Sequence, residues 1–198
     1  MNKRWWHKSK TNTALFSFTT SAIITFALFG SIYTGAYLIW KEAVPMTKVD
    51  RPVKLTIPSI EVDANVQSVG LTPDGAIGIP TNFTDVAWYN DGPKPGELGN
   101  AIIDGHLDNA IDSDAVFSKL GDLKKGDSIY VTDDTGQKIY FRVTSAATYD
   151  TDNFPNEKIF GQTGNTAQLT LITCAGDWNP STKSYNQILV VTTEHSID

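Results

Sequence analysis

Short runs of apolar and β-branched residues alternate with turn residues along the chain after residue 52, at intervals of about 8–15 residues. Runs of this length and composition are typical of β-strands, and their even spacing favours an all-β barrel or sandwich. The predicted strands are Val53–Ile57, Val66–Val69, Val86–Tyr89, Ala101–Asp104, Ser128–Thr132, Gln137–Ser145, Leu169–Cys174 and Gln187–Thr193.

The segments between these strands predict one hairpin and one or two short helices. Asp133–Gly136 has the turn residues of a hairpin connection. Asp112–Leu120 carries capping residues and an apolar set that suit one or two helical turns. Asn153–Leu169 is long for a loop, and Phe154–Phe160 within it favours another short helix. Long loops are often functional, and this one leads directly into the predicted strand Leu169–Cys174.

The N-terminal region has a different pattern, with no charged residue between Thr11 and Trp40. About 20 apolar residues suffice to cross a bilayer, and the basic residues before the span predict a cytoplasmic N-terminus. The sequence therefore predicts a cytoplasmic tail (1–13), a transmembrane signal anchor (14–40), a linker (41–52) and an extracellular domain (53–198). The alternative is a secretory signal cleaved after a small residue such as Ala36, although such signals usually have a shorter apolar region.

Charge separates the same two regions. The 198 residues contain 16 Lys and Arg and 22 Asp and Glu, and only six of the former and two of the latter lie in residues 1–50. The remaining residues are therefore strongly acidic, which disfavours a nucleic-acid surface. Cation binding at a cell surface would use this acidity, but a solvated, soluble exterior explains it more simply. A single cysteine excludes an intrachain disulfide, so the domain must be stabilised by packing.

That cysteine, Cys174, ends a predicted strand and precedes a predicted turn at Asp177–Pro180. A lone cysteine is most often a small buried hydrophobic residue. A position where a strand leaves the core favours a nucleophile instead, provided that a base lies nearby in space. His106 is the candidate, because a short strand and Gly105 lead directly to it. The other two histidines, His7 and His195, lie before the apolar span and in the C-terminal tail.

On these residues the chain resembles the sortase family, the cysteine transpeptidases of Gram-positive cell surfaces. The matching segments come in the family's order and cover nearly everything after residue 51. The Thr-Leu-Ile-Thr-Cys run and the Gly-His pair are specific only when they occur together. The segments are Leu55–Ile60, Gly70–Leu71 with Asp74–Gly75, Pro95–Asn100 with Gly105–His106, Val116–Phe117 with Leu120, Lys125–Asp127 and Leu169–Cys174.

The resemblance implies a closed sortase-type β-barrel and a transpeptidation reaction, for which we expect no cofactor. Cys174 would attack the threonine carbonyl of a sorting signal such as Leu-Pro-x-Thr-Gly and form a thioester. His106 would protonate the departing amine as a general acid. An amine of a cell-wall precursor or of another surface protein would then resolve the thioester. Membrane anchoring suits this reaction, because enzyme, substrate and acceptor then share one surface.

One position departs from the family's pattern. Sortases carry an arginine on the strand after the cysteine loop, and by alignment Ile188 occupies that place. Loss of one hydrogen-bond donor to an oxyanion typically lowers the rate by about 10²–10³. Lys183 and Asn186 are nearby in sequence and offer partial replacements, and Arg142 lies on another predicted strand. The chain is thus a low-activity form, natural or engineered, or it uses another donor, or it binds sorting peptides without turning them over.

Acidic residues near the two candidates have two interpretations. Asp104 and Asp108 flank His106 and would orient it, or they are solvated loop carboxylates. Asp177 and Trp178 follow the cysteine and would line a substrate groove, or Trp178 caps the barrel. No set of residues has the ligand count of a zinc site or the spacing of an EF-hand, so we expect no metal.

Overall fold

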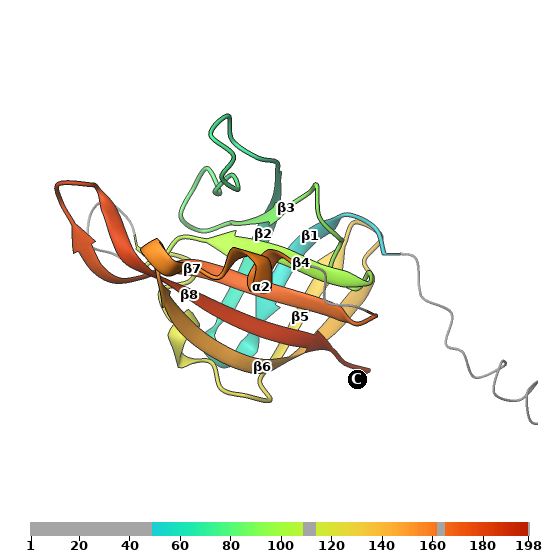
Figure 1. Ribbon diagram of the computed structural model, residues 1–198. Helices are drawn as coiled ribbons and strands as arrows, with labels where there is room; N and C mark the ends of the chain where they lie inside the picture. Colours follow the sequence, from blue (N-terminus) through green and yellow to red (C-terminus); the bar gives the residue numbers. More distant parts are fainter. Residues whose placement is uncertain (1–48, 109–113, 162–164, 198) are drawn as a thin grey trace, which may run out of the picture. The chain divides into compact units, whose positions relative to one another are not determined.

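The computed structural model describes residues 49–108, 114–161 and 165–197. Eight strands in this part of the chain close into a barrel in the order β1-β2-β3-β4-β7-β8-β6-β5 (Figure 1). The all-β barrel predicted from the sequence is confirmed. The strands are β1 (Pro52–Ile57), β2 (Val62–Val69), β3 (Val86–Tyr89), β4 (Gly99–Gly105), β5 (Ser128–Asp133), β6 (Lys138–Asp150), β7 (Ala167–Asn179) and β8 (Ser184–His195).

Two of the neighbouring strand pairs are parallel, and both involve strands that are not joined by a tight turn. β2 pairs with β3, and β4 pairs with β7. The other pairs are antiparallel, and β1 with β5 closes the barrel. The parallel pairing brings the carboxyl end of β4 beside the middle of β7, where Gly105 and Thr173 are in contact although 68 residues separate them in sequence.

The barrel interior follows the alternation of side chains along each strand. Leu55 and Ile57 of β1 and Ile129 and Val131 of β5 are fully buried, whereas the residues between them are more exposed. Phe117, which follows β4, fills the same interior. It packs so tightly against Gly105 that a Cβ there would lie 2.5 Å from the ring. The period-2 pattern therefore determines which residues form the inner core.

A second apolar group, which we call the outer cluster, lies on the outside of the sheet. It is covered by the helix α2 (Asn156–Phe160), which lies across β4 and β7 in Figure 1. The Asn100 side chain of β4 donates a 2.7 Å hydrogen bond to the Ile159 carbonyl and so holds the helix on the sheet. This helix confirms the short helix predicted in the long loop. The outer cluster consists of Ile102, Ile159, Ile172 and Val190.

The strands β7 and β8 extend beyond the barrel, which differs from the predicted turn at Asp177–Pro180. Residues Ala175–Asn179 and Ser184–Gln187 form a two-stranded hairpin arm, seen at the left of Figure 1. The ring of Trp178 packs 5.2 Å from that of Tyr185, which provides the cross-strand contact that continues the pairing. The turn residues at 180–183 form the tip of the arm instead.

The described part of the predicted helix at Asp112–Leu120 also differs from expectation. Residues 116–119 form turns, and a short 3₁₀ helix follows at Leu120–Asp122. Its Leu120 is fully buried in the inner core, so packing and not helical periodicity determines this segment. Two further 3₁₀ turns, Pro58–Ile60 and Thr151–Asn153, connect strands.

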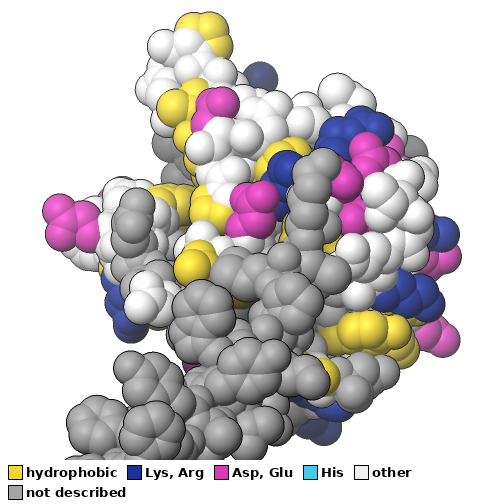
Figure 2. Space-filling view, turned by 90° about the vertical axis from the view of Figure 1, so that its right-hand side faces the viewer, with side chains coloured by type: hydrophobic (Ala, Val, Ile, Leu, Met, Phe, Trp, Pro, Cys, Tyr) yellow, Lys and Arg dark blue, Asp and Glu magenta, His cyan; other side chains and the backbone are white. Residues whose placement is uncertain are grey.

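The predicted tail (1–13), membrane anchor (14–40) and most of the linker (41–52) lie outside the described residues. The chain divides between Thr47 and Lys48, and the barrel belongs to the second unit. Within the described ranges, no helix has the length and apolar character needed to span a bilayer. The surface at the end of the barrel away from the hairpin arm carries acidic and basic side chains side by side (Figure 2).

Candidate active site

Cys174 and His106 lie where two adjacent parallel strands leave the barrel: His106 directly follows the last residue of β4, and Cys174 lies within β7, which continues to Asn179. Asp104 of β4 pairs with Ile172 of β7, and the two candidates each lie two residues beyond that pair. Between them, the buried Thr173 hydroxyl donates a 2.8 Å hydrogen bond to the Gly105 carbonyl. That hydrogen bond fixes the two strand ends relative to each other. The structure therefore brings both predicted residues to one edge of the barrel.

The thiol of Cys174 is located where β7 passes from the core to the surface. Leu169 to Thr173 are buried, whereas Cys174 is exposed. Side chains alternate along a strand, so Cys174 lies on the same outer face as Ile172 of the outer cluster. The strand thus holds the thiol rigidly while leaving it accessible to a ligand, as the sequence predicted.

Ile188 stands directly opposite Cys174 in the antiparallel pair of β7 and β8. Its side chain packs against the outer cluster and so lies on the same face as the thiol. A residue at this place is well situated to contact anything bound at Cys174. An isoleucine side chain offers only apolar contact there, because it has no hydrogen-bond donor.

The replacement donors considered from the sequence differ in where they lie, and Asn186 lies on β8, two residues before Ile188. Arg142 donates to the Gly126 carbonyl and the Ser128 hydroxyl, seven residues along β6 from Tyr149, the partner of Ile188. Seven strand residues span about 23 Å, which is beyond side-chain reach. The Asn186 side-chain oxygen accepts a 2.7 Å hydrogen bond from the Asp177 amide.

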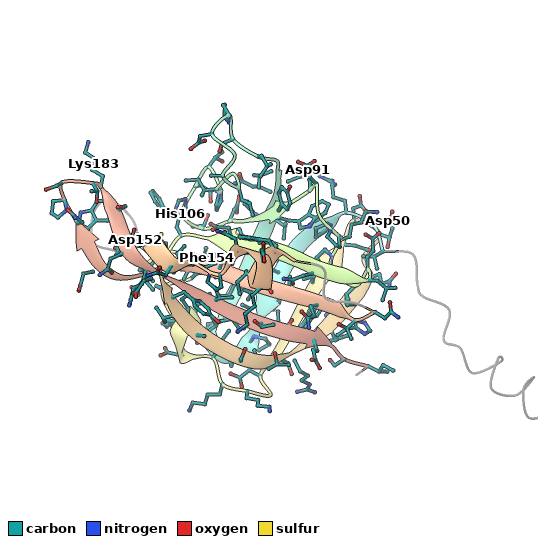
Figure 3. All side chains as sticks on the ribbon, viewed as in Figure 1. Asp50, Asp91, His106, Asp152, Phe154 and Lys183 are labelled. Atoms are coloured by element: carbon teal, nitrogen blue, oxygen red, sulfur yellow. The ribbon has the colours of Figure 1, made fainter. Side chains whose placement is uncertain are left out.

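Lys183 lies at the tip of the hairpin arm, away from His106 (Figure 3). Its backbone has a positive φ of 52°, typical of a turn residue. The arm also contains Gly176 at φ +78°, beside the irregularity in the pairing of β7 with β8. A Cβ at Gly176 would collide with the Asn186 side chain that holds this irregularity. Both residues therefore shape the arm.

His106 lies at the same end of the barrel as Asp152 and the hairpin arm, whereas Asp50 lies at the opposite end (Figure 3). Its Nε2 atom is 3.0 Å from the Pro80 carbonyl oxygen. A carbonyl only accepts, so Nε2 carries a proton and Nδ1 is the other exchangeable position. The ring also packs against Phe83, with centroids 4.9 Å apart. These contacts, which the sequence did not reveal, orient the imidazole.

The two acidic neighbours of His106 have separate surroundings. Asp108 accepts a hydrogen bond from the Tyr185 hydroxyl, which links the segment after His106 to the hairpin arm. Asp104 lies on β4, and burial raises the pKa of its carboxyl to about 7. Among the described residues, the imidazole hydrogen-bonds to the Pro80 carbonyl and to neither carboxylate.

The electrostatic surroundings of Cys174 oppose formation of the thiolate. Burial raises the pKa of the thiol above its ordinary value, and the negative charges of Asp104 and Asp108 raise it further. A thiolate is the nucleophilic form, so only a small fraction of Cys174 is reactive near neutral pH.

Trp178, which is half exposed, packs on Tyr185 in the arm and so does not cap the barrel. Among the described residues, no three potential ligands gather as a metal site.

Comparisons with known proteins agree with this geometry. The sortase-domain family model matches residues 55–196. A comparison with curated protein sequences finds no match. Among solved structures, a lid mutant of sortase A from Corynebacterium diphtheriae aligns with a TM-score of 0.58 and 21% identity, over 78% of this chain and 75% of that one. Sortase A from Listeria monocytogenes aligns with a TM-score of 0.55 and 23% identity, over 75% and 89%. Sortase C-1 from Actinomyces oris aligns with a TM-score of 0.55 and 23% identity, over 75% of this chain and 76% of that one.

Proposed function

Because this chain belongs to the sortase family, we propose that it is a membrane-anchored transpeptidase that uses Cys174 as its nucleophile. Its substrate would be a secreted protein with a C-terminal sorting signal of the Leu-Pro-x-Thr-Gly type. The observation that carries this proposal is that the parallel pairing of β4 with β7 brings Cys174 and His106 to the same edge of the barrel, each two residues beyond the pair Asp104 and Ile172. A family member without catalysis would have no need for that arrangement.

The first half of the reaction is acylation. The Cys174 thiolate attacks the threonine carbonyl of the signal, a carbon–sulfur bond forms, and the peptide carbon–nitrogen bond breaks. His106 delivers a proton to the departing amine nitrogen. The contacts of the ring with Pro80 and Phe83 keep it in one orientation for this transfer. In the second half, an amine of a cell-wall precursor or of a surface protein attacks the thioester and releases the thiol.

The outer face of the barrel offers a place for the apolar part of the signal. Ile172 and Ile188 flank the thiol along and across the strands, and α2 covers the same face nearby. An extended peptide lying beside α2 would gain apolar contact with the partly exposed Ile188 and present its threonine carbonyl to Cys174.

A specific observation also supports a second candidate function. Ile188 leaves the place beside the thiol without a donor, and the charges near Cys174 are negative. A module of this kind would bind sorting peptides beside Ile188 and Cys174 and turn them over slowly or not at all. The test must therefore separate binding from acylation.

Single-turnover acylation provides that test. The purified full-length chain in detergent micelles is mixed with a panel of Leu-Pro-x-Thr-Gly-type peptides, and mass spectrometry detects a thioester on Cys174. The matched variants are Cys174→Ser, which loses the nucleophile, and Ile188→Arg, which adds a donor. An adduct on the wild type supports the transpeptidase. An adduct only on Ile188→Arg supports the binding module, and peptide titration then measures its affinity.

Localisation has a separate test, because the chain has one cysteine. We propose that residues 14–40 span the membrane once, with the N-terminus in the cytoplasm and the barrel outside. A membrane-impermeant maleimide added to intact cells would then label Cys174, with Cys174→Ser as the unlabelled control. Labelling only after lysis would contradict the extracellular placement.

A further inference from the structure

Asp104 occupies a position on the outer face of the barrel that usually suits an apolar side chain. Its register partners are Ala87 of β3 and Ile172 of β7, and both are buried. Ile102, two residues earlier on the same face of β4, belongs to the outer cluster. A carboxylate among such neighbours loses hydration, which disfavours its charged form. Burial raises the pKa of Asp104 to about 7, so its neutral and ionised forms are both present near that pH.

The position also brings Asp104 close to the thiol. Ile172 is the partner of Asp104, and Cys174 is the next residue of β7 on the same face. Cys174 therefore lies diagonally across from Asp104 on one side and directly opposite Ile188 on the other. At this position, burial raises the pKa of the Cys174 thiol and the negative charge of Asp104 raises it further.

The other ionisable groups around Asp104 come from each neighbouring element. His106 and Asp108 follow it in the chain, Tyr89 lies on β3, Cys174 on β7 and Tyr185 on β8. The Glu157 and Lys158 side chains of α2 are exposed to solvent. Asp108 adds a second negative charge that acts on the thiol. An arginine in place of Ile188 would have supplied the opposite charge.

We propose that Asp104 and Cys174 form a coupled acid pair that carries a single negative charge near neutral pH. Asp104 is then a positioning residue that controls the ionisation of the nucleophile. The proton of the thiol passes to the carboxylate, so that an S–H bond breaks, an O–H bond forms and the total charge is unchanged. Two neighbouring acids resist double ionisation because their negative charges repel each other, which is the physical basis of the coupling.

This assignment rests on the proposed function only in taking Cys174 as the nucleophile. Its test is the rate of alkylation by iodoacetamide as a function of pH, because this reagent reports the thiolate without a sorting peptide. In the full-length chain, Asp104→Asn removes the charge and keeps the shape. We expect its thiol to ionise at lower pH and to react about 3–10-fold faster at pH 8, since one pKa unit is a tenfold change in thiolate.

Two variants serve as controls. Asp134→Asn makes the same charge change in the β5–β6 turn, where Asp134 pairs with Arg51, and should keep the wild-type profile. Asp104→Glu keeps the charge and should also keep the thiol reactivity near that of the wild type. A rate for Asp104→Asn equal to or below the wild-type rate would overturn the pair.

A measurement without any change at Asp104 covers the case in which Asp104→Asn does not fold. Carbon-13 NMR of the Asp104 carboxyl should show a second titration step at the pH where the thiol ionises, and Cys174→Ser should remove that step. A single step in both proteins would overturn the coupling and leave the transpeptidase proposal intact. Conversely, a coupled pair without any peptide adduct would overturn the transpeptidase and leave the pair.

Discussion

The two halves of β7 behave differently, although they form one continuous strand. Leu169 to Thr173 are buried, and Leu169 to Ile172 pair on both sides, with β4 and β8. Residues Ala175–Asn179 pair with β8 in the hairpin arm, and most are exposed. Cys174 lies at the boundary between them. A nucleophile placed there takes its rigidity from the buried half and its access to substrate from the exposed half.

The difference also shows where the free energy of folding comes from. The buried half contributes apolar area to the inner core, whereas the arm is held by a few contacts between its two strands. An isolated two-stranded hairpin is at best marginally stable in water. Changes in the two halves should therefore affect different properties of the protein.

The largest expected effect is a difference in the free energy of unfolding lost by substitutions in the two halves of β7. Leu171→Ala leaves a cavity in the inner core and should lower the free energy of unfolding by about 2–5 kcal/mol. Trp178→Ala, in the exposed arm, should lower it by less than about 1 kcal/mol. Denaturant titration followed by circular dichroism measures both. Equal losses would show that the arm is part of the cooperative core.

The next effect concerns the connection between the two strand ends. Thr173→Val removes the donor to the Gly105 carbonyl and leaves that buried acceptor unpaired, at a cost of about 1–3 kcal/mol. We expect single-turnover acylation to fall about tenfold or more, because His106 and Cys174 are no longer fixed relative to each other.

Thr170→Val is the matched control. Thr170 lies on β7 like Thr173, and its hydroxyl donates a buried hydrogen bond to Asn100 of β4, which the substitution removes. It should lower stability by a similar amount and leave acylation near the wild-type rate. A parallel loss of acylation in both variants would show that general destabilisation explains the effect.

The third expected effect is the pH dependence of the free energy of unfolding that arises from Asp104, which lies beside the boundary between the two halves of β7. The folded-state pKa of Asp104, about 7, exceeds its ordinary value of 3.8, so the folded state binds the proton more tightly. Its contribution to stability is complete below about pH 4 and is lost as the pH rises to 7. Compared with Asp104→Asn, the wild type should therefore lose stability over this range in thermal unfolding. A constant difference between the two proteins across this range would contradict the raised pKa.

The smallest expected effect tests the contact between the arm and the segment after His106. Tyr185→Phe removes the hydroxyl that donates to Asp108 and keeps the ring against Trp178. We expect acylation to change a few-fold and unfolding by about 1 kcal/mol or less. Tyr140→Phe, on β6, is a matched control and should leave acylation unchanged. An unchanged rate for Tyr185→Phe would show that the arm does not influence the site.

Much of the barrel was predictable because strand periodicity is local. The runs Val86–Tyr89 and Ser128–Thr132 were assigned within one residue of β3 and β5. The predicted end of β7 was wrong because Trp178 and Tyr185 extend the strand through contact with a partner that a local pattern does not contain. The helix expected at Asp112–Leu120 was replaced in its described part by turns, because Leu120 packs into the core.

In the candidate site, too, some residues were predictable from local sequence and others depended on contacts between distant segments. Cys174 and His106 were identified from their strand endings, and Ile188 from its alignment with the family's arginine. Pro80, Phe83 and Tyr185 were not identified, because their contacts join segments that are distant in sequence. Asp104 was noted only as a neighbour of His106, and its relation to the thiol depends on the register of β4 with β7.

The sequence by itself determined the strands, the inner face of the barrel and the identity of the two candidate residues, because alternating side chains and turn residues act over a few positions. The tertiary structure alone decided which strands became neighbours. The parallel pairing of β4 with β7 brings Asp104, His106 and Cys174 to one edge. The antiparallel pairing of β7 with β8 places Ile188 opposite the thiol. Burial and charge act through space, so the ionisation of Cys174 became apparent only once these neighbours were known.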